Sequence, residues 1–302
     1  MALKSWLKFL YLGIVWGATF LWIKIGLREM EPITFTALRL GVAVTGIAII
    51  ALILRPPLPK RSNLVDFAVL GVFNIALPFI LITWSEKYIT SGLASILNCT
   101  VPLFTMILAQ IFVSDDPITL PRAIGLLVGF GGVVVLVSDQ LGGPINMLQW
   151  GQWGVLAASL SYAIAVIYAR RRTFTLAPSV QALGQNFFAN LAVWSLAFGL
   201  EGSFSLPRLP LTWLSIAWLG IMATCIGTVL YYYLLREIGP TRTTLTTYIF
   251  PLVGVLLGVI FLNEQVDWRL AVGGVLIIVG VAVVNSQIRL PLRVKNGVNQ
   301  QP

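Results

Sequence analysis

Residues 91–112 read SGLASILNCTVPLFTMILAQIF, and residues 240–261 read PTRTTLTTYIFPLVGVLLGVIF. At an offset of 149 positions and without a gap, the two segments share identical pairs, namely Pro102-Leu103 with Pro251-Leu252 and Ile111-Phe112 with Ile260-Phe261. The alignment extends over residues 64–138 and 213–287. This alignment predicts that the chain consists of two copies of one structural repeat.

The composition places both copies in a membrane. Hydrophobic residues make up 58% of the chain and charged residues 10%, whereas a soluble domain has about 25% charged residues. Continuous apolar runs favour helices over a transmembrane barrel, whose strands alternate with period two. Ten stretches have about the 20 residues that a helix needs to cross the hydrocarbon, and they are 5–27, 32–54, 64–84, 91–113, 120–138, 151–170, 179–199, 211–235, 241–262 and 268–287.

Each copy therefore holds five spans, and an odd number forces the second copy to insert upside down. We expect an all-α integral membrane protein with a first five-helix repeat over 1–138 and an inverted second repeat over 151–288. Residues 139–150 form an external linker, and the polar, basic tail 289–302 is expected to be disordered in the cytoplasm. Inverted repeats are typical of secondary transporters, which bind substrate between the halves.

The basic residues indicate the orientation. With the N-terminus inside, the cytoplasmic side carries fourteen, which are Lys4, Lys8, Arg55, Lys60, Arg61, Arg122, Arg170, Arg171, Arg172, Arg236, Arg242, Arg289, Arg293 and Lys295. The outer side carries four, which are Arg28, Lys87, Arg208 and Arg269. This bias predicts that both termini are cytoplasmic. It also accounts for the net charge of +9 without a nucleic-acid partner.

The order of the motifs resembles the drug/metabolite transporter superfamily, specifically its ten-helix EamA-like exporter family. The resemblance covers about residues 5–288, and its motifs are LGIVWGATFLWIKIGL (12–27), EPITFTALRL (31–40), EKYITSGLASILNCTVPLFTMILAQIFVSDD (86–116) and REIGPTRTTLTTYIFPLVGVLLGVIFLNEQ (236–265). In that family the acid after the fourth helix is commonly Glu, and here the first copy has Asp115.

The resemblance implies an exporter of small metabolites in a prokaryotic inner membrane. It also implies that helices 1–4 and 6–9 surround a central cavity, while helices 5 and 10 lie at the periphery. The family handles amino acids, their derivatives and other small organic solutes, so it does not fix one substrate.

Polar and aromatic side chains within the spans are the candidate solute contacts. They are Trp16, Thr19, Asn74, Trp84, Asn98, Pro102, Tyr162, Gln185, Tyr232, Thr247, Tyr248 and Pro251. Amides and hydroxyls with aromatic walls suit a small, partly apolar solute, although interhelical hydrogen bonds and interfacial belts use the same residue types. The two prolines each remove a backbone hydrogen bond within a helix; such irregular centres often line a substrate path, and a purely structural bend is the alternative.

Lys24 and Arg39 are the basic residues inside the predicted spans, where a charge usually faces a cavity or a partner. Either could receive a solute carboxylate. Alternatively, Lys24 extends to the interface and Arg39 ties helices together. The chain has no histidine and no acid at the centre of a span, which leaves Glu86, at the end of the third span, as the candidate for proton coupling.

Together these features predict a secondary transporter that exports amino acids or their derivatives by alternating access. A lipid or lipid-precursor translocator, or a transporter of nucleosides, sugars or drugs, remains the alternative. We expect no enzyme activity, catalytic residue, metal or cofactor, because histidine is absent and no nucleotide-binding motif occurs. The expected partners are a small solute and membrane lipid, and glycine-rich faces on the fifth and tenth spans leave a homodimer open.

Overall fold

The computed structural model describes residues 3–57, 59–112, 119–138, 146–172, 176–202, 206–238, 243 and 245–285 of the 302-residue chain. Within these ranges it consists of helices and connecting turns, without a β-strand. The tail 289–302, most of the linker 139–150 and Asp115 lie outside the described residues.

We call residues 1–138 the first half and 151–288 the second half. The first half contains α1 (Leu3–Gly17), α2 (Thr19–Gly26), α3 (Pro32–Leu54), α4 (Asn63–Gly71), the π-helix η1 (Val72–Ala76), α5 (Leu77–Ser85), α6 (Ser91–Asn98), α7 (Val101–Phe112) and α8 (Leu120–Val137). From the linker onward follow α9 (Met147–Arg172), α10 (Pro178–Leu196), the π-helix η3 (Ala197–Glu201), α11 (Pro210–Trp218), the π-helix η4 (Leu219–Ile226), α12 (Gly227–Ile238), the 3-10 helix η5 (Leu245–Tyr248), α14 (Ile249–Leu262) and α15 (Trp268–Asn285).

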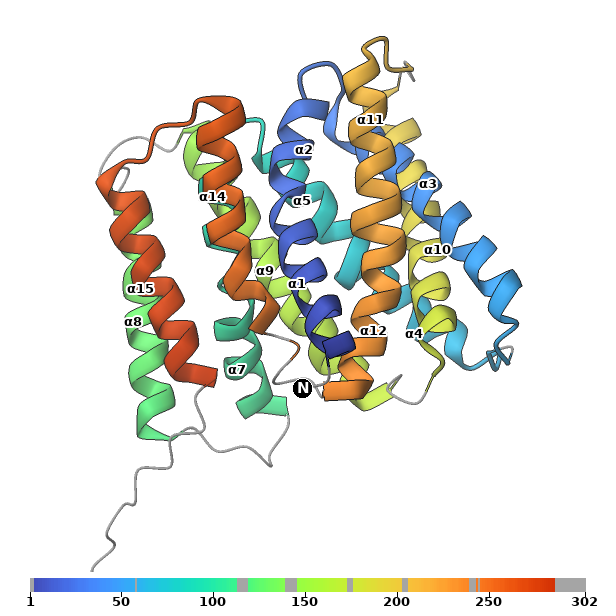
Figure 1. Ribbon diagram of the computed structural model, residues 1–302, viewed down its shortest axis with the longest axis horizontal. Helices are drawn as coiled ribbons and strands as arrows, with labels where there is room; N and C mark the ends of the chain where they lie inside the picture. Colours follow the sequence, from blue (N-terminus) through green and yellow to red (C-terminus); the bar gives the residue numbers. More distant parts are fainter. Residues whose placement is uncertain are drawn as a thin grey trace, which may run out of the picture.

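Several of these elements join into long apolar rods. Among the described residues, seven helical stretches are long and apolar enough to cross a membrane. Two shorter apolar helices, Thr246–Leu262 and Trp268–Val284, accompany them. The rods run side by side, and α8 and α15 form a pair at one edge (Figure 1). That edge position agrees with the peripheral place that the resemblance implies for the fifth and tenth helices.

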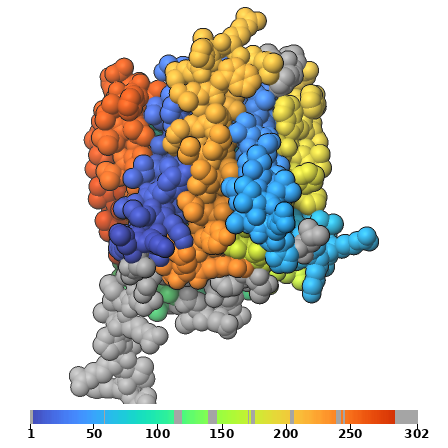
Figure 2. Space-filling view, turned by 45° about the vertical axis from the view of Figure 1, so that its right-hand side comes forward, coloured from blue at the N-terminus to red at the C-terminus, as the bar shows by residue number. Residues whose placement is uncertain are grey.

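The two halves interleave. Figure 2 shows the rod of α11, η4 and α12, from the second half, lying between α1 and α3 of the first. Glycines allow this close approach at aligned positions. A Cβ on Gly220 would come within 2.9 Å of the main-chain oxygen of Arg39, and a Cβ on Gly71 within 2.8 Å of that of Gln185. The space between the halves is therefore enclosed by helices from both.

Prolines and π-helices interrupt the rods near their middles. Pro102 is the second residue of α7, and Pro251 is the third residue of α14, which follows the 3-10 turn η5. Proline is tolerated in a first turn because the N–H that it lacks has no intrahelical partner there. The π-helix η1 shifted by 149 positions falls at 221–225, inside η4. Such π segments occur frequently at functional sites.

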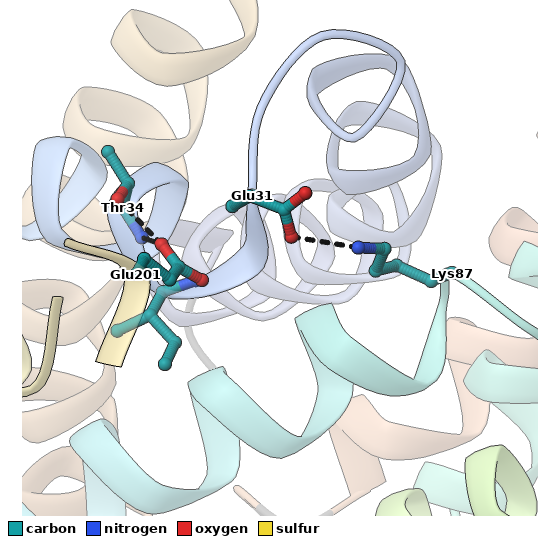
Figure 3. A network of polar contacts seen from close by, with 5 residues as sticks. Glu31, Thr34, Lys87 and Glu201 are labelled. Atoms are coloured by element: carbon teal, nitrogen blue, oxygen red, sulfur yellow. Dashed lines mark hydrogen bonds and ion pairs between the residues drawn. The ribbon is translucent and has the colours of Figure 1, made fainter. Parts of the chain in front are cut away.

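Carboxylates cap helix N-termini, whose first N–H groups lack partners within the helix. Glu201 accepts hydrogen bonds from Thr34 N (2.8 Å) and Thr34 Oγ1 (2.6 Å) at the start of α3 (Figure 3). Glu264 accepts from Ser91 N (2.7 Å) and Gly92 N (3.0 Å) at the start of α6. Both acids belong to the second half and both capped helices to the first, so these charge-assisted bonds tie the halves together.

Glu29 makes the reverse connection, from the first half to the second. Its carboxylate accepts main-chain hydrogen bonds from Arg208 and Leu209, just before α11. Desolvation opposes ionisation of Glu29, but these backbone donors outweigh it and hold its pKa below the usual value. The carboxylate is therefore ionised at neutral pH, as a cap at a positive helix terminus requires.

The α8–α15 pair depends on glycine, and we expect Gly280→Ala to destabilise the protein by about 1–3 kcal/mol through overpacking. A Cβ on Gly280 would lie 2.4 Å from Gly129 N and 2.6 Å from Gly125 O, which are backbone atoms that cannot step aside. Gly131→Ala, in the same α8 helix, is the matched control because nothing lies within 4 Å of its added Cβ. Thermal unfolding in detergent measures both; equal transition temperatures would contradict the close contact.

Glu201→Ala should cost about 1–3 kcal/mol of stability, because it leaves the first turn of α3 without its charged acceptor. Glu31→Ala is the control, because Glu31 contacts Lys87 at 2.8 Å with a side chain that is 63% exposed (Figure 3). An exposed pair of this kind contributes about 0–1 kcal/mol. Denaturant titration of the two variants in micelles checks the difference, and a larger loss for Glu31→Ala would refute it.

Candidate functional site

A central cavity of about 190 Å³ lies between the two halves. Nine of the candidate residues line it, which are Trp16, Thr19, Arg39, Asn74, Asn98, Tyr162, Gln185, Tyr232 and Thr247. These side chains come from both halves, from α1, α2, α3, η1 and α6 on one side and α9, α10, α12 and η5 on the other. Sequence positions far apart thus converge on one space.

Other candidates do not line this cavity. They are Lys24, Trp84, Glu86, Pro102, Tyr248 and Pro251. Trp84 packs edge-on against Tyr88, with ring centroids 5.2 Å apart, and Pro102 and Pro251 are buried in the first turns of their helices. Their assignment as solute contacts stays a prediction, as does that of the residues that line the cavity.

The cavity also has lining residues that the sequence analysis did not single out. They include Phe20, Ile23, Phe79, Thr228, Tyr231, Thr243, Thr246 and Phe250. A signal for many of them was present in the spacing. Lining positions 16, 19, 20 and 23, and again 243, 246, 247 and 250, follow the i, i+3, i+4, i+7 pattern of one helical face.

Each π-helix beside the cavity offers a main-chain carbonyl to the opposite half. Trp16 Nε1 donates to Ala223 O in η4 at 2.8 Å, and Ser161 Oγ donates to Phe73 O in η1 at 2.7 Å. Trp16 and Ser161 occupy aligned positions of the two halves, since the early helices align at an offset slightly smaller than 149, here 145 positions. The irregular backbone thus obtains hydrogen-bond partners that hydrocarbon could not supply.

A second pair of contacts also joins aligned residues of the two halves to the π-helix of the opposite half. Arg39 Nε donates to Thr224 Oγ1 in η4 at 3.1 Å, and Asn74 Nδ2 in η1 donates to Gln185 Oε1 at 3.0 Å. Arg39 and Gln185 are aligned between the halves at an offset of 146 positions, which also pairs Pro32 with Pro178. Tyr232 Oη also donates to Gln185 Oε1, at 3.1 Å. One side of the cavity therefore presents a guanidinium where the other presents a hydrogen-bonded amide.

Aromatic rings form a third part of the wall. The ring centroids of Trp16 and Tyr231 are 5.6 Å apart, and those of Trp16 and Phe250 are 6.1 Å apart. Asn98 lies nearby on α6, with its Oδ1 3.5 Å from Ser159 Oγ of α9. The cavity therefore combines aromatic faces, amides, hydroxyls and one guanidinium.

Lys24 and Glu86 meet away from the cavity, near the outward end that the charge bias predicts. Lys24 Nζ donates to the main-chain oxygens of Glu86 and Ile89, the latter at 2.7 Å. The Glu86 carboxylate is fully buried, and neither of its oxygens has a hydrogen-bond partner among the described residues. Burial raises the pKa of Glu86 well above its usual value, while the positive charge of Lys24 opposes that rise. Proton coupling through Glu86 stays a prediction.

The described residues contain no cluster of three or more His, Cys, Asp or Glu side chains that could hold a metal ion. Cys99 and Cys225 are buried and free. The cavity offers hydrogen bonds, one positive charge and aromatic contact to a ligand.

Comparison with known proteins identifies relatives over nearly the whole chain. An uncharacterized transporter of Archaeoglobus fulgidus is 28% identical over 290 residues, covering 93% of this chain and 99% of the relative. The uncharacterized inner membrane transporter YedA of Escherichia coli K12 is 30% identical over 271 residues, covering 87% of this chain and 85% of YedA. The uncharacterized transporter YoaV of Bacillus subtilis is 22% identical over 291 residues.

A protein of known crystal structure shares the fold with a TM-score of 0.66 at 20% identity, and the match covers 93% of this chain and 96% of that one. The model of the EamA-like transporter family matches residues 4–138 and again residues 149–286. The two matches span both halves, and the chain therefore belongs to the EamA-like transporter family.

Proposed function

We propose that this multi-pass membrane protein exports small metabolites, with amino acids or their derivatives as the favoured solutes. It resides in a prokaryotic inner membrane, where its relative YedA is named as a transporter. In this proposal ten helices span the bilayer, both termini are cytoplasmic, and the halves are inverted copies. The observation that carries the proposal is the cavity between the halves, which is lined by polar groups from the predicted membrane spans.

The cavity has the size and character of a solute site. One water molecule needs roughly 10–15 Å³ of such space, so about 190 Å³ holds roughly a dozen waters or a solute with a similar number of heavy atoms. Aromatic and apolar walls with a few placed polar groups are the usual lining of small-molecule sites. Polar groups at membrane depth are costly, and function is the usual reason for them.

The aligned contacts support alternating access. Trp16 and Ser161 each bind a π-helix carbonyl of the opposite half, and Arg39 and Gln185 each contact a π-helix side chain of the opposite half. When one half rocks against the other, one set of contacts can weaken while the aligned set becomes tighter. In inverted-repeat transporters such rocking opens the site alternately to the two sides of the membrane.

Reconstituted protein should catalyse saturable flux of neutral amino acids across liposome membranes. Labelled amino acids, nucleosides, sugars and organic cations are tested with and without a pH gradient, and protein-free liposomes are the control. Faster solute flux in the presence of the pH gradient would support Glu86 as the group that couples transport to protons. Flux of labelled lipid alone would replace solute export with lipid translocation, and silence across the whole panel would overturn the proposal.

Asn98→Leu should lower solute flux about fivefold, because it removes a cavity amide worth about 1 kcal/mol to a bound polar solute. Ser195→Ala is the control, since the exposed Ser195 does not line the cavity and its hydroxyl donates to Leu191 O within its own helix, and its flux should stay within about twofold of the parent protein. Both variants are compared at equal amounts of monodisperse protein. A larger loss for Ser195→Ala than for Asn98→Leu would place the solute elsewhere.

A further inference from the structure

We propose that the transported solute carries a carboxylate group, and that Arg39 is the residue that receives it. This inference rests on the proposed function and specifies the substrate class of the same cavity. It also separates the two basic residues that the sequence leaves equivalent, Lys24 and Arg39.

Arg39 is a buried cation that no carboxylate of a described residue contacts, although the buried Glu86 acts on it electrostatically from beyond ion-pair distance. Its residue is 4% exposed, Nε donates to Thr224 Oγ1, and the guanidinium lies over the ring of Phe79 at 4.0 Å from the centroid. No carboxylate of a described residue forms an ion pair with it. A guanidinium has five N–H donors, and within the described residues its one hydrogen bond uses Nε. An unpaired buried charge is destabilising. The remaining N–H donors of Arg39 would therefore be stabilised by an acceptor on a bound solute.

Lys24 is in the opposite situation. Its ammonium already donates to the carbonyls of Glu86 and Ile89 at the end of α5, and it does not line the cavity. Lys24 therefore serves the packing of helices. Gln185, the position aligned with Arg39, is neutral, and its Oε1 accepts two hydrogen bonds. The cationic anchor is consequently on the first-half wall of the cavity.

The other residues that line the cavity indicate which charge on the solute is favoured. Among the described lining residues, Arg39 is the one charged side chain, and the others are apolar, aromatic, hydroxyl or amide groups. A cationic solute would meet an unbalanced like charge, whereas a carboxylate neutralises it. The planar guanidinium fork matches the two carboxylate oxygens. The solute's skeleton can lie against apolar and aromatic walls formed by Trp16, Phe20, Tyr231 and Phe250.

Two solute classes share this chemistry, namely zwitterionic amino acids and simple organic acids. Four compounds with one carbon skeleton separate them: leucine, leucinamide, 4-methylpentanoate and 4-methylpentanamide. Binding of each to the purified full-length protein is measured by isothermal titration, and flux of each is measured in proteoliposomes. We expect both acids to bind at least about tenfold more tightly than the corresponding amides. Tighter binding of leucine would identify the solutes as amino acids, and tighter binding of 4-methylpentanoate would identify them as simple organic acids.

Arg39→Gln should bring the affinity for both acids down to that of the amides while leaving amide binding unchanged. Arg39→Lys should retain part of the preference, because it keeps the charge and loses the fork. Lys87→Gln is the matched control, since it removes one positive charge from a partly exposed site outside the cavity. If Arg39→Gln does not fold, the acid and amide comparison on the parent protein still decides the question.

Amides that bind as well as the acids, or an Arg39→Gln variant that keeps the full acid preference, would overturn the inference. Flux of amides or of other uncharged solutes would in that case leave the proposed export function standing. Absence of binding and flux for all four compounds would also overturn the inference, whereas the export function falls only if the wider panel is silent as well.

Discussion

The whole structure depends on one constraint: in hydrocarbon, every backbone polar group needs a partner within the protein. The rods are helical for that reason, and at the π-helices η1 and η4 the opposite half supplies a partner for a main-chain carbonyl. Trp16 and Ser161 bind carbonyls of η4 and η1, and Glu201 and Glu264 bind the N–H groups at the starts of α3 and α6. The interruptions therefore do more than bend helices. They create the contacts through which the halves recognise each other, and the cavity lies among them.

This arrangement separates two tasks between parts of the molecule. The α8–α15 pair at the edge packs backbone against backbone through Gly125, Gly129 and Gly280, which leaves little freedom to move. The interleaved rods around the cavity meet through hydrogen bonds at irregular backbone. Close glycine contacts and polar contacts between the halves thus lie in different regions of the protein.

Much of this could be read from the sequence. Apolar runs of spanning length gave the helices, the 149-residue offset related η1 to η4, and polar residues inside apolar runs pointed to nine of the residues that line the cavity. The surroundings of individual side chains could be learned only from the structure. Spacing alone could not tell that Lys24 is satisfied by carbonyls while Arg39 faces the cavity, because both are single cations within apolar spans. Nor could it place Tyr248 off the cavity when its neighbour Thr247 lines it, since one residue of the 3-10 helix η5 turns the side chain by about 120°.

The carboxylate caps have a consequence for how the chain is made. Ribosomes deliver the N-terminal half first, so α3 and α6 enter the bilayer before Glu201 and Glu264 exist. Until those acids are synthesised, the exposed N–H groups at both helix starts must rely on water or lipid headgroups near the membrane surface. Folding therefore includes a late step, in which Glu201 and Glu264 of the second half bind the helix starts of the first.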